Sequence, residues 1–401
     1  MGVCPEIGLR LAQAHFPGSD SVRARGSVVS KSTVNSPVPL SIVLLDNFTG
    51  LCDYRCGNAL TFAQFDTGDF GWRTVMTTIG DVAKAAGLSV STVSRALNGS
   101  GYVSEEAKVR VEQAASLLQY TPNGLARGLV SKRTSSIGLL IPDVSNPFFA
   151  DVARGTEDEA AAIGYSVILC NSDWQVSREK MYINILRSRW VDGVVIAGAR
   201  IEEERLREDL RDVPFVLVDR RSSAVADSVW IDNEEGGFLA TQHLLECGCR
   251  NIVHISGAGD SPSGQARLKG YLRAIRLETG IQSSVIQGDF RFESGYNATR
   301  MLLTGPNPPD AIFAGNDMMG LGVLQAAQSL GCSIPDRLKV VGYDNISFAA
   351  YVSPSLTTIE QPSYTMGSAA VKMLADAISN PQHRPTSYEI QPKLVVRKSS
   401  S

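Results

Sequence analysis

Several features that mark other classes of protein are scarce in this sequence. No apolar run approaches the roughly 20 residues that a membrane-spanning helix requires. Residues 1–20 lack the basic start and unbroken apolar core of a secretory signal. These absences argue against a membrane or secreted protein, and we expect a soluble, cytoplasmic chain that has no membrane partner.

Paired metal ligands are also scarce. Only four of the 401 residues are histidine, and the seven cysteines are scattered, with Cys247–Cys249 and Cys52–Cys56 as isolated pairs. Neither pair has a second one at zinc-ligand spacing, so reduced thiols are favoured over a zinc site. The glycine-containing segment 256–265 lacks the Lys-Ser/Thr of a phosphate-binding loop. We therefore expect that the protein binds no metal or cofactor, has no catalytic residues and is not an enzyme.

The charge is small overall but unevenly spread. The net charge of −3 divides into zero over residues 1–75, +3 over residues 76–136 and −6 over the remainder. A small basic segment joined to a larger acidic body suits a DNA-binding head on a domain with another task.

Residues 1–75 show no sustained helical or strand period, and we assign them no fold. Met76 stands directly before the first strong pattern. Two interpretations remain open for residues 1–75: a mis-assigned upstream extension, with the biological start at Met76, or a flexible arm.

The segment Thr77–Gly99, TTIGDVAKAAGLSVSTVSRALNG, has the pattern of a helix-turn-helix. We expect a helix over 79–86 ended by Gly87, a second over about 90–97 capped by Ser89, and a third over about 105–118. The second helix would lie in the major groove of DNA, so residues 76–121 form the predicted DNA-binding domain. Its candidate DNA contacts are Ser89, Val90, Ser91, Thr92, Ser94 and Arg95.

From residue 137 onward, short apolar runs alternate with amphipathic segments of 10–15 residues. This pattern predicts βαβ units and parallel sheets, and about 265 residues suit two lobes with a cleft between them. Ligands of such sheets bind beyond the carboxyl ends of the strands. The aromatic, charged and amide residues expected there suit a small polyol: Asn146, Phe148, Phe149, Asp219, Arg220, Arg267, Phe290, Asn316, Asp344 and Gln361.

The helix-turn-helix segment and the later run YTPNGLARGLVSKRTSSIGLLIPDVSNPFF together closely resemble the lactose/galactose-repressor family (LacI/GalR). The resemblance extends from Met76 to the C-terminus. It implies a homodimeric transcriptional regulator, most simply a repressor, that binds double-stranded operator DNA. It also implies a periplasmic-binding-protein-like effector and dimerisation domain over 137–401.

The resemblance further implies a hinge helix and linker over 122–136 that orders in the minor groove. The hinge residues that it assigns to DNA contact are Asn123, Ala126, Arg127 and Leu129, with Leu129 as the wedge between base steps. Gly124 and Gly128 depart from the family pattern. Because glycine weakens a short helix, we expect the hinge to be ordered only on a specific site.

The effector half also resembles periplasmic sugar-binding proteins, and all ten candidate positions match their ribose-contacting pattern. Ribose or a related pentose is therefore the first choice of effector, and a purine is the alternative. A sugar-binding transport receptor is a further alternative, which the missing signal peptide and the added DNA-binding head disfavour.

Overall fold

The computed structural model divides the chain into two compact units, Met1–Pro122 and Asn123–Ser401. It describes residues 77–99, 101–120, 133–223, 225–380 and 382–401, together with three short strands further upstream. Those strands are β1 (Cys52–Cys56), β2 (Ala59–Ala63) and β3 (Arg73–Thr74), which pair antiparallel in the order β1-β2-β3. The sequence patterns did not predict them. The hinge candidates Asn123, Ala126, Arg127 and Leu129 lie outside the described residues.

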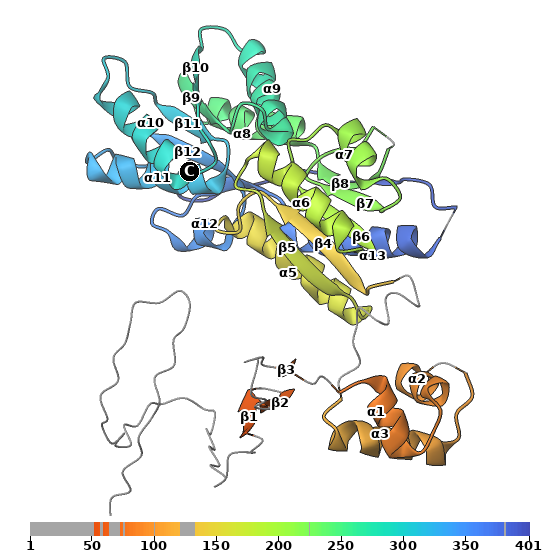
Figure 1. The fold of residues 1–401 in the computed structure, drawn as a ribbon. Coiled ribbons are helices and arrows are strands. Elements are labelled where there is room, and N and C mark those ends of the chain that lie inside the picture. Colours follow the sequence, from red (N-terminus) through yellow and green to blue (C-terminus); the bar gives the residue numbers. More distant parts are fainter. Residues whose placement is uncertain are drawn as a thin grey trace, which may run out of the picture. The chain divides into compact units, whose positions relative to one another are not determined.

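Three helices form the head: α1 (Ile79–Ala86), α2 (Val90–Asn98) and α3 (Glu105–Leu117) (Figure 1). Thr78 and Asp81 form a capping box at the start of α1, which satisfies two backbone N–H groups. Gly87 ends α1 in the left-handed region, at φ 63°, where glycine carries no steric penalty. The three expected helices are present, with ends within one residue of those expected.

The core of the head consists of small and branched residues from all three helices. Val82, Val93 and Val111 are each completely buried. Val109 and Leu117 of α3 are apolar but lie outside this core, since they are 47% and 81% exposed. Both lie on the solvent side of α3, whereas Val111 and Ala114 face α1 and α2.

The N-terminal lobe of the second unit is built on a six-stranded parallel sheet of order β14-β8-β7-β6-β4-β5. Its strands are β4 (Ser136–Ile141), β5 (Ser166–Asn171), β6 (Gly193–Ala197), β7 (Phe215–Val218), β8 (Asp227–Ile231) and β14 (Ser387–Ile390). Its helices are α5 (Pro147–Ala162), α6 (Val176–Ser188), α7 (Glu203–Leu210) and α13 (Ser363–Ser379).

The C-terminal lobe has a second six-stranded sheet, of order β10-β9-β11-β12-β13-β15, in which only β15 is antiparallel. Its strands are β9 (Asn251–Ser256), β10 (Gln282–Gln287), β11 (Ala311–Ala314), β12 (Lys339–Asp344), β13 (Thr357–Glu360) and β15 (Lys393–Val395). Its helices are α8 (Asn233–Glu246), α9 (Pro262–Arg276), α10 (Phe292–Thr304), α11 (Asp317–Ser329) and α12 (Ser347–Tyr351).

The chain passes between the lobes three times, after β8, after β13 and between β14 and β15. The blue helix α13 consequently packs beside the yellow helix α5 of the N-terminal lobe (Figure 1). The predicted fold class, a helical head followed by a two-lobed α/β domain with parallel sheets, is confirmed. Within the described residues no helix is long and apolar enough to cross a membrane.

Candidate functional site

The outer face of α2 presents the candidate DNA contacts. Val90 is 49% exposed, and Ser91 and Arg95 beside it are exposed as well. The Nε of Arg95 donates to the carbonyl oxygen of Ser91 at 3.2 Å, which lays the side chain along this face. That bond uses one of the five N–H groups of a guanidinium.

The remaining candidates on α2 have local partners. The Oγ of Ser89 accepts the backbone N–H of Thr92 at 3.2 Å, so Ser89 caps the helix. Thr92 and Ser94 are half-buried, and Ser94 Oγ accepts from Asn98 at 3.3 Å. Ser91 Oγ also has a local partner, Ser89 Oγ at 2.9 Å, so Val90, Ser91 and Arg95 are distinguished only as exposed candidates that do not cap the helix.

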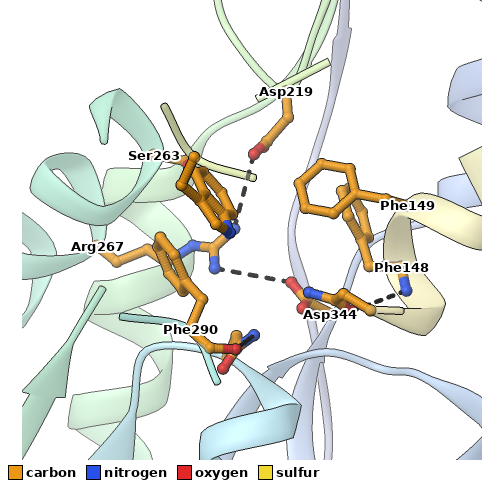
Figure 2. A pocket seen from close by; sticks show the side chains of 10 residues that line it. Phe148, Phe149, Asp219, Ser263, Arg267, Phe290 and Asp344 are labelled. Atoms are coloured by element: carbon orange, nitrogen blue, oxygen red, sulfur yellow. Dashed lines mark hydrogen bonds and ion pairs between the residues drawn. The ribbon is translucent and has the colours of Figure 1, made fainter. Parts of the chain in front are cut away.

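In the second unit a pocket lies between the lobes at the carboxyl ends of the strands. Eight of the ten effector candidates line it. Trp174 and Ser263 line it as well, although they were not predicted from the sequence. Figure 2 shows Arg267 and Phe290 of the C-terminal lobe opposite Phe148 and Phe149 of the N-terminal lobe. The full lining is Asn146, Phe148, Phe149, Trp174, Asp219, Ser263, Arg267, Phe290, Asn316 and Asp344.

Arg220 and Gln361 do not line the pocket. The Nη1 of Arg220 donates to the carbonyl oxygen of Ile201 at 2.7 Å, within the N-terminal lobe. Gln361 lies behind Asp344, to whose Oδ1 its Nε2 donates at 2.8 Å. In this structure Arg220 therefore braces a loop and Gln361 orients a pocket carboxyl.

Arg267 is the hub of the pocket. Its guanidinium is 3.9 Å from Asp219 Oδ2 and 3.6 Å from Asp344 Oδ1, and it lies 3.8 Å from the centre of the Tyr343 ring. Its Nε donates to Asn233 Oδ1 at 2.8 Å, and its Nη1 donates to the carbonyl oxygen of Gly315 at 2.6 Å. A side chain only 3% exposed with this many partners is fixed in one position.

Close helix packing places Arg267. Helices α8 and α9 approach so nearly that a Cβ on Gly237 would lie 2.3 Å from the carbonyl oxygen of Arg267, and one on Gly270 would lie 2.0 Å from that of Glu234. Only glycine permits this approach. Arg267 lies in the second turn of α9, which begins at Pro262.

Three buried carboxyls surround this cation or lie behind it. Burial raises the pKa of Asp219, although Arg267 and Asn233 oppose the rise. Burial likewise raises the pKa of Asp344 to about 7, against the opposing charge of Arg267. The pKa of Asp317 is raised well above its ordinary value, first by burial and then by the negative charge of Asp344. Asp344 therefore titrates close to neutral pH.

Aromatic rings from both lobes line the pocket. Phe148 and Phe149 meet edge to face at 5.0 Å, Phe149 meets Trp174 at 5.8 Å, and Trp174 stacks on Phe290 at 5.2 Å. Asn146 caps α5, with its Oδ1 accepting the N–H of Phe148 at 3.0 Å. Rings and carboxyls thus line the same pocket, a combination that suits a ligand with C–H faces and hydroxyl edges.

Four of the lining residues have a backbone that L-amino acids rarely adopt. The φ angles are 58° at Trp174, 61° at Asp219, 68° at Phe290 and 113° at Asp344. Non-glycine residues in this region cost of order 1–3 kcal/mol each and cluster at functional sites. This strain could not be predicted from the sequence. The positive φ angles distinguish these four positions from ordinary strand ends.

Two family models match this chain. Residues 78–123 match bacterial regulatory proteins of the lacI family, and residues 241–400 match a periplasmic binding protein-like domain. The ribose operon repressor of Halalkalibacterium halodurans is 40% identical over 325 residues, covering 81% of this chain and 97% of the repressor. The chain belongs to the lacI family. The family resemblance carried by Thr77–Gly99 and the segment after it is thereby confirmed.

Further relatives and solved structures resemble this lacI-family chain. A PurR repressor of Edwardsiella ictaluri is 38% identical over 330 residues, covering 81% of this chain and 97% of that protein. The structure of a lac repressor dimer bound to operator has a TM-score of 0.74 and 26% identity, covering 81% of this chain and 99% of that one. A family member of Enterococcus faecium with bound ribose has a TM-score of 0.61 and 31% identity, covering 66% and 98%.

Membership establishes a DNA-binding transcriptional regulator with a ligand-responsive domain. Repressors of this family are generally not enzymes. Among the described residues no group of three histidine, cysteine or acidic side chains is placed to hold a metal ion.

Proposed function

We propose that this regulator is a homodimeric repressor in the cytoplasm, without catalytic activity, whose affinity for operator DNA is set by ribose or a closely related pentose. The single observation that best supports the pentose is Arg267 held between Asp219 and Asp344, in a pocket that aromatic rings also line. Charged acceptors and donors pair with hydroxyls, and rings cover C–H faces. A ribose operon repressor among the relatives supports the same ligand.

The proposed mechanism couples the two units through lobe movement. Ribose stabilises the closed lobes because it contacts residues of both, and a ligand shifts such an equilibrium only through this difference in affinity. In a dimer, lobe movement changes the separation of the two DNA-binding heads, which must match two operator half-sites. The predicted hinge links lobe movement to the DNA-binding heads through its contacts with DNA, at Asn123, Ala126, Arg127 and Leu129.

A purine effector is the second candidate, because repressors named PurR are 38–40% identical to this chain. Ribose and purines are distinguished by a thermal-shift screen of D-ribose, D-xylose, hypoxanthine and guanine on the full chain. We expect D-ribose to give the largest stabilisation, since bound ligand stabilises the folded state in proportion to the logarithm of its excess over Kd. A shift with hypoxanthine or guanine alone would replace ribose by a purine.

Asp219→Ala tests the site. We expect ribose to bind roughly tenfold or more weakly, because the sugar hydroxyls lose a charged acceptor, while affinity for operator without ribose is unchanged. Titration calorimetry and an electrophoretic mobility shift measure the two affinities. An unaltered ribose response in this variant removes Asp219 from the site.

Because the pKa of Asp344 is raised, we expect the affinity for ribose to depend on pH. Sugar hydroxyls donate to the ionised carboxyl, so binding favours loss of the Asp344 proton, and affinity rises with pH. With a pKa of about 7 before binding, the affinity should increase about tenfold between pH 6 and pH 8. Asp344→Asn should bind weakly at every pH, with a flat profile; a flat profile in the unmodified protein contradicts the assignment.

A further inference from the structure

Trp174 lines the pocket and contacts side chains of both lobes. It follows β5 in the N-terminal lobe, and its ring stacks on Phe290 of the C-terminal lobe with the ring planes 28° apart. The stack therefore joins the two lobes directly over the pocket.

Two ion pairs between the lobes flank this stack. Asp173 Oδ1 lies 2.8 Å from Arg291 Nη2, so the consecutive residues 173–174 meet the consecutive residues 290–291. Arg200 places its guanidinium 5.4 Å from the Trp174 ring and pairs with Asp260 Oδ2 at 2.9 Å. Arg200 follows β6 of the N-terminal lobe, and Asp260 precedes α9 of the C-terminal lobe.

Behind the stack the pocket is tight. Its free volume is about 10 Å³, room for about one water molecule, so a sugar enters only as the lobes separate. Outside it lies a second cavity of about 300 Å³ that shares Asn146 and Phe290 with the pocket. This outer cavity carries Asp143, Asp173 and Glu293 against Arg291.

We propose that Trp174, after moving outward to admit a sugar, packs against it where the two lobes meet and restricts the effector to an unsubstituted, uncharged monosaccharide. The inference rests on the proposed function, because it concerns which sugars the same pocket accepts. A substituent on the sugar extends between the lobes at Trp174 and Phe290 and keeps them from closing around the sugar. A phosphate also meets the acidic lining of the outer cavity.

The test compares D-ribose, methyl β-D-ribofuranoside and D-ribose 5-phosphate by titration calorimetry on the full chain. The unmodified protein should bind ribose at least about tenfold more tightly than either substituted sugar. In Trp174→Ala the preference over the methyl riboside should shrink to within about threefold, whereas discrimination against the phosphate persists because the acidic residues remain. Trp190→Ala is the matched control, since Trp190 is 69% exposed and does not line the pocket.

Arg291→Gln supplies a second test if the alanine variant does not fold. The substitution removes the ion pair between Arg291, whose side chain is 48% exposed, and Asp173. Ribose should then dissociate severalfold faster, and the preference for ribose over its methyl riboside should become smaller. Equal affinity of the unmodified protein for ribose and its methyl riboside overturns this inference alone. The inference is also overturned if Trp174→Ala and Arg291→Gln both keep the full preference for ribose over its methyl riboside. Absence of ribose binding to the unmodified protein overturns the proposed function, and this inference with it.

Discussion

Replacing Arg267 with methionine should abolish ribose binding and destabilise the two-lobed unit by about 3–5 kcal/mol. The change leaves the buried carboxyls of Asp219 and Asp344 without the cation between them, only 6% and 4% exposed. Such groups must take up protons or remain as uncompensated charges, and either outcome is costly. It also removes the donors to Asn233 and Gly315, whose acceptor atoms become unpaired in the interior.

Urea unfolding of the full chain, followed by far-ultraviolet circular dichroism, measures the stability change, and calorimetry with D-ribose measures binding. Arg273→Met is the matched control on the same helix. Arg273 is 41% exposed and pairs with Glu234 and Glu235, so its loss should cost at most about 1 kcal/mol. Equal destabilisation by the two substitutions would contradict the role of Arg267 as the buried hub.

The strand-end rule explains why so much of the pocket could be predicted. Asp219 follows β7 and Asp344 ends β12, and both strands are continuous apolar runs that mark their own carboxyl ends. Phe148 and Phe149 could be predicted because they follow the apolar run that begins at residue 137. These positions depend on local pattern alone, and the sequence carries that pattern.

The residues that escaped prediction depend on tertiary structure. Trp174 lies in a turn after β5, where its φ of 58° and its stack on Phe290 arise from lobe packing. Ser263 was assigned to a glycine-containing loop, but Pro262 already begins α9, as proline often does in the first turn. Arg220 was placed in the pocket beside Asp219, yet its guanidinium reaches back to Ile201. Side-chain direction at a strand end is not encoded in spacing.

Strand β10 shows the same dependence on tertiary structure. Its sequence QSSVIQ is mostly exposed at the edge of the C-terminal sheet and lacks the apolar run of the central strands. Its place is set by pairing with β9, whose residues 251–256 match it in register.

Arg95→Ala should reduce discrimination between operator and altered operator by about 1–3 kcal/mol, which corresponds to about fivefold to 150-fold in relative affinity. Arg95 is exposed on α2, and its bond to the Ser91 carbonyl oxygen directs the side chain along the face that also carries Val90. A guanidinium on such a face pairs with guanine O6 and N7, and this pairing is lost on the altered base pair.

The measurement is the ratio of dissociation constants for an operator selected from random DNA and for single-base variants of it, at one salt concentration, because phosphate contacts alone vary strongly with salt. Lys108→Ala is the charge-matched control: Lys108 lies on α3 and pairs with Glu105 at 2.5 Å. It removes one positive charge from the head but should leave the ratio unchanged. Ribose affinity should be the same in both variants, since Arg95 and Lys108 belong to the other compact unit. An Arg95→Ala protein that loses affinity equally for all sequences would reduce this arginine to a phosphate contact, and base recognition would then rest on Val90 and Ser91.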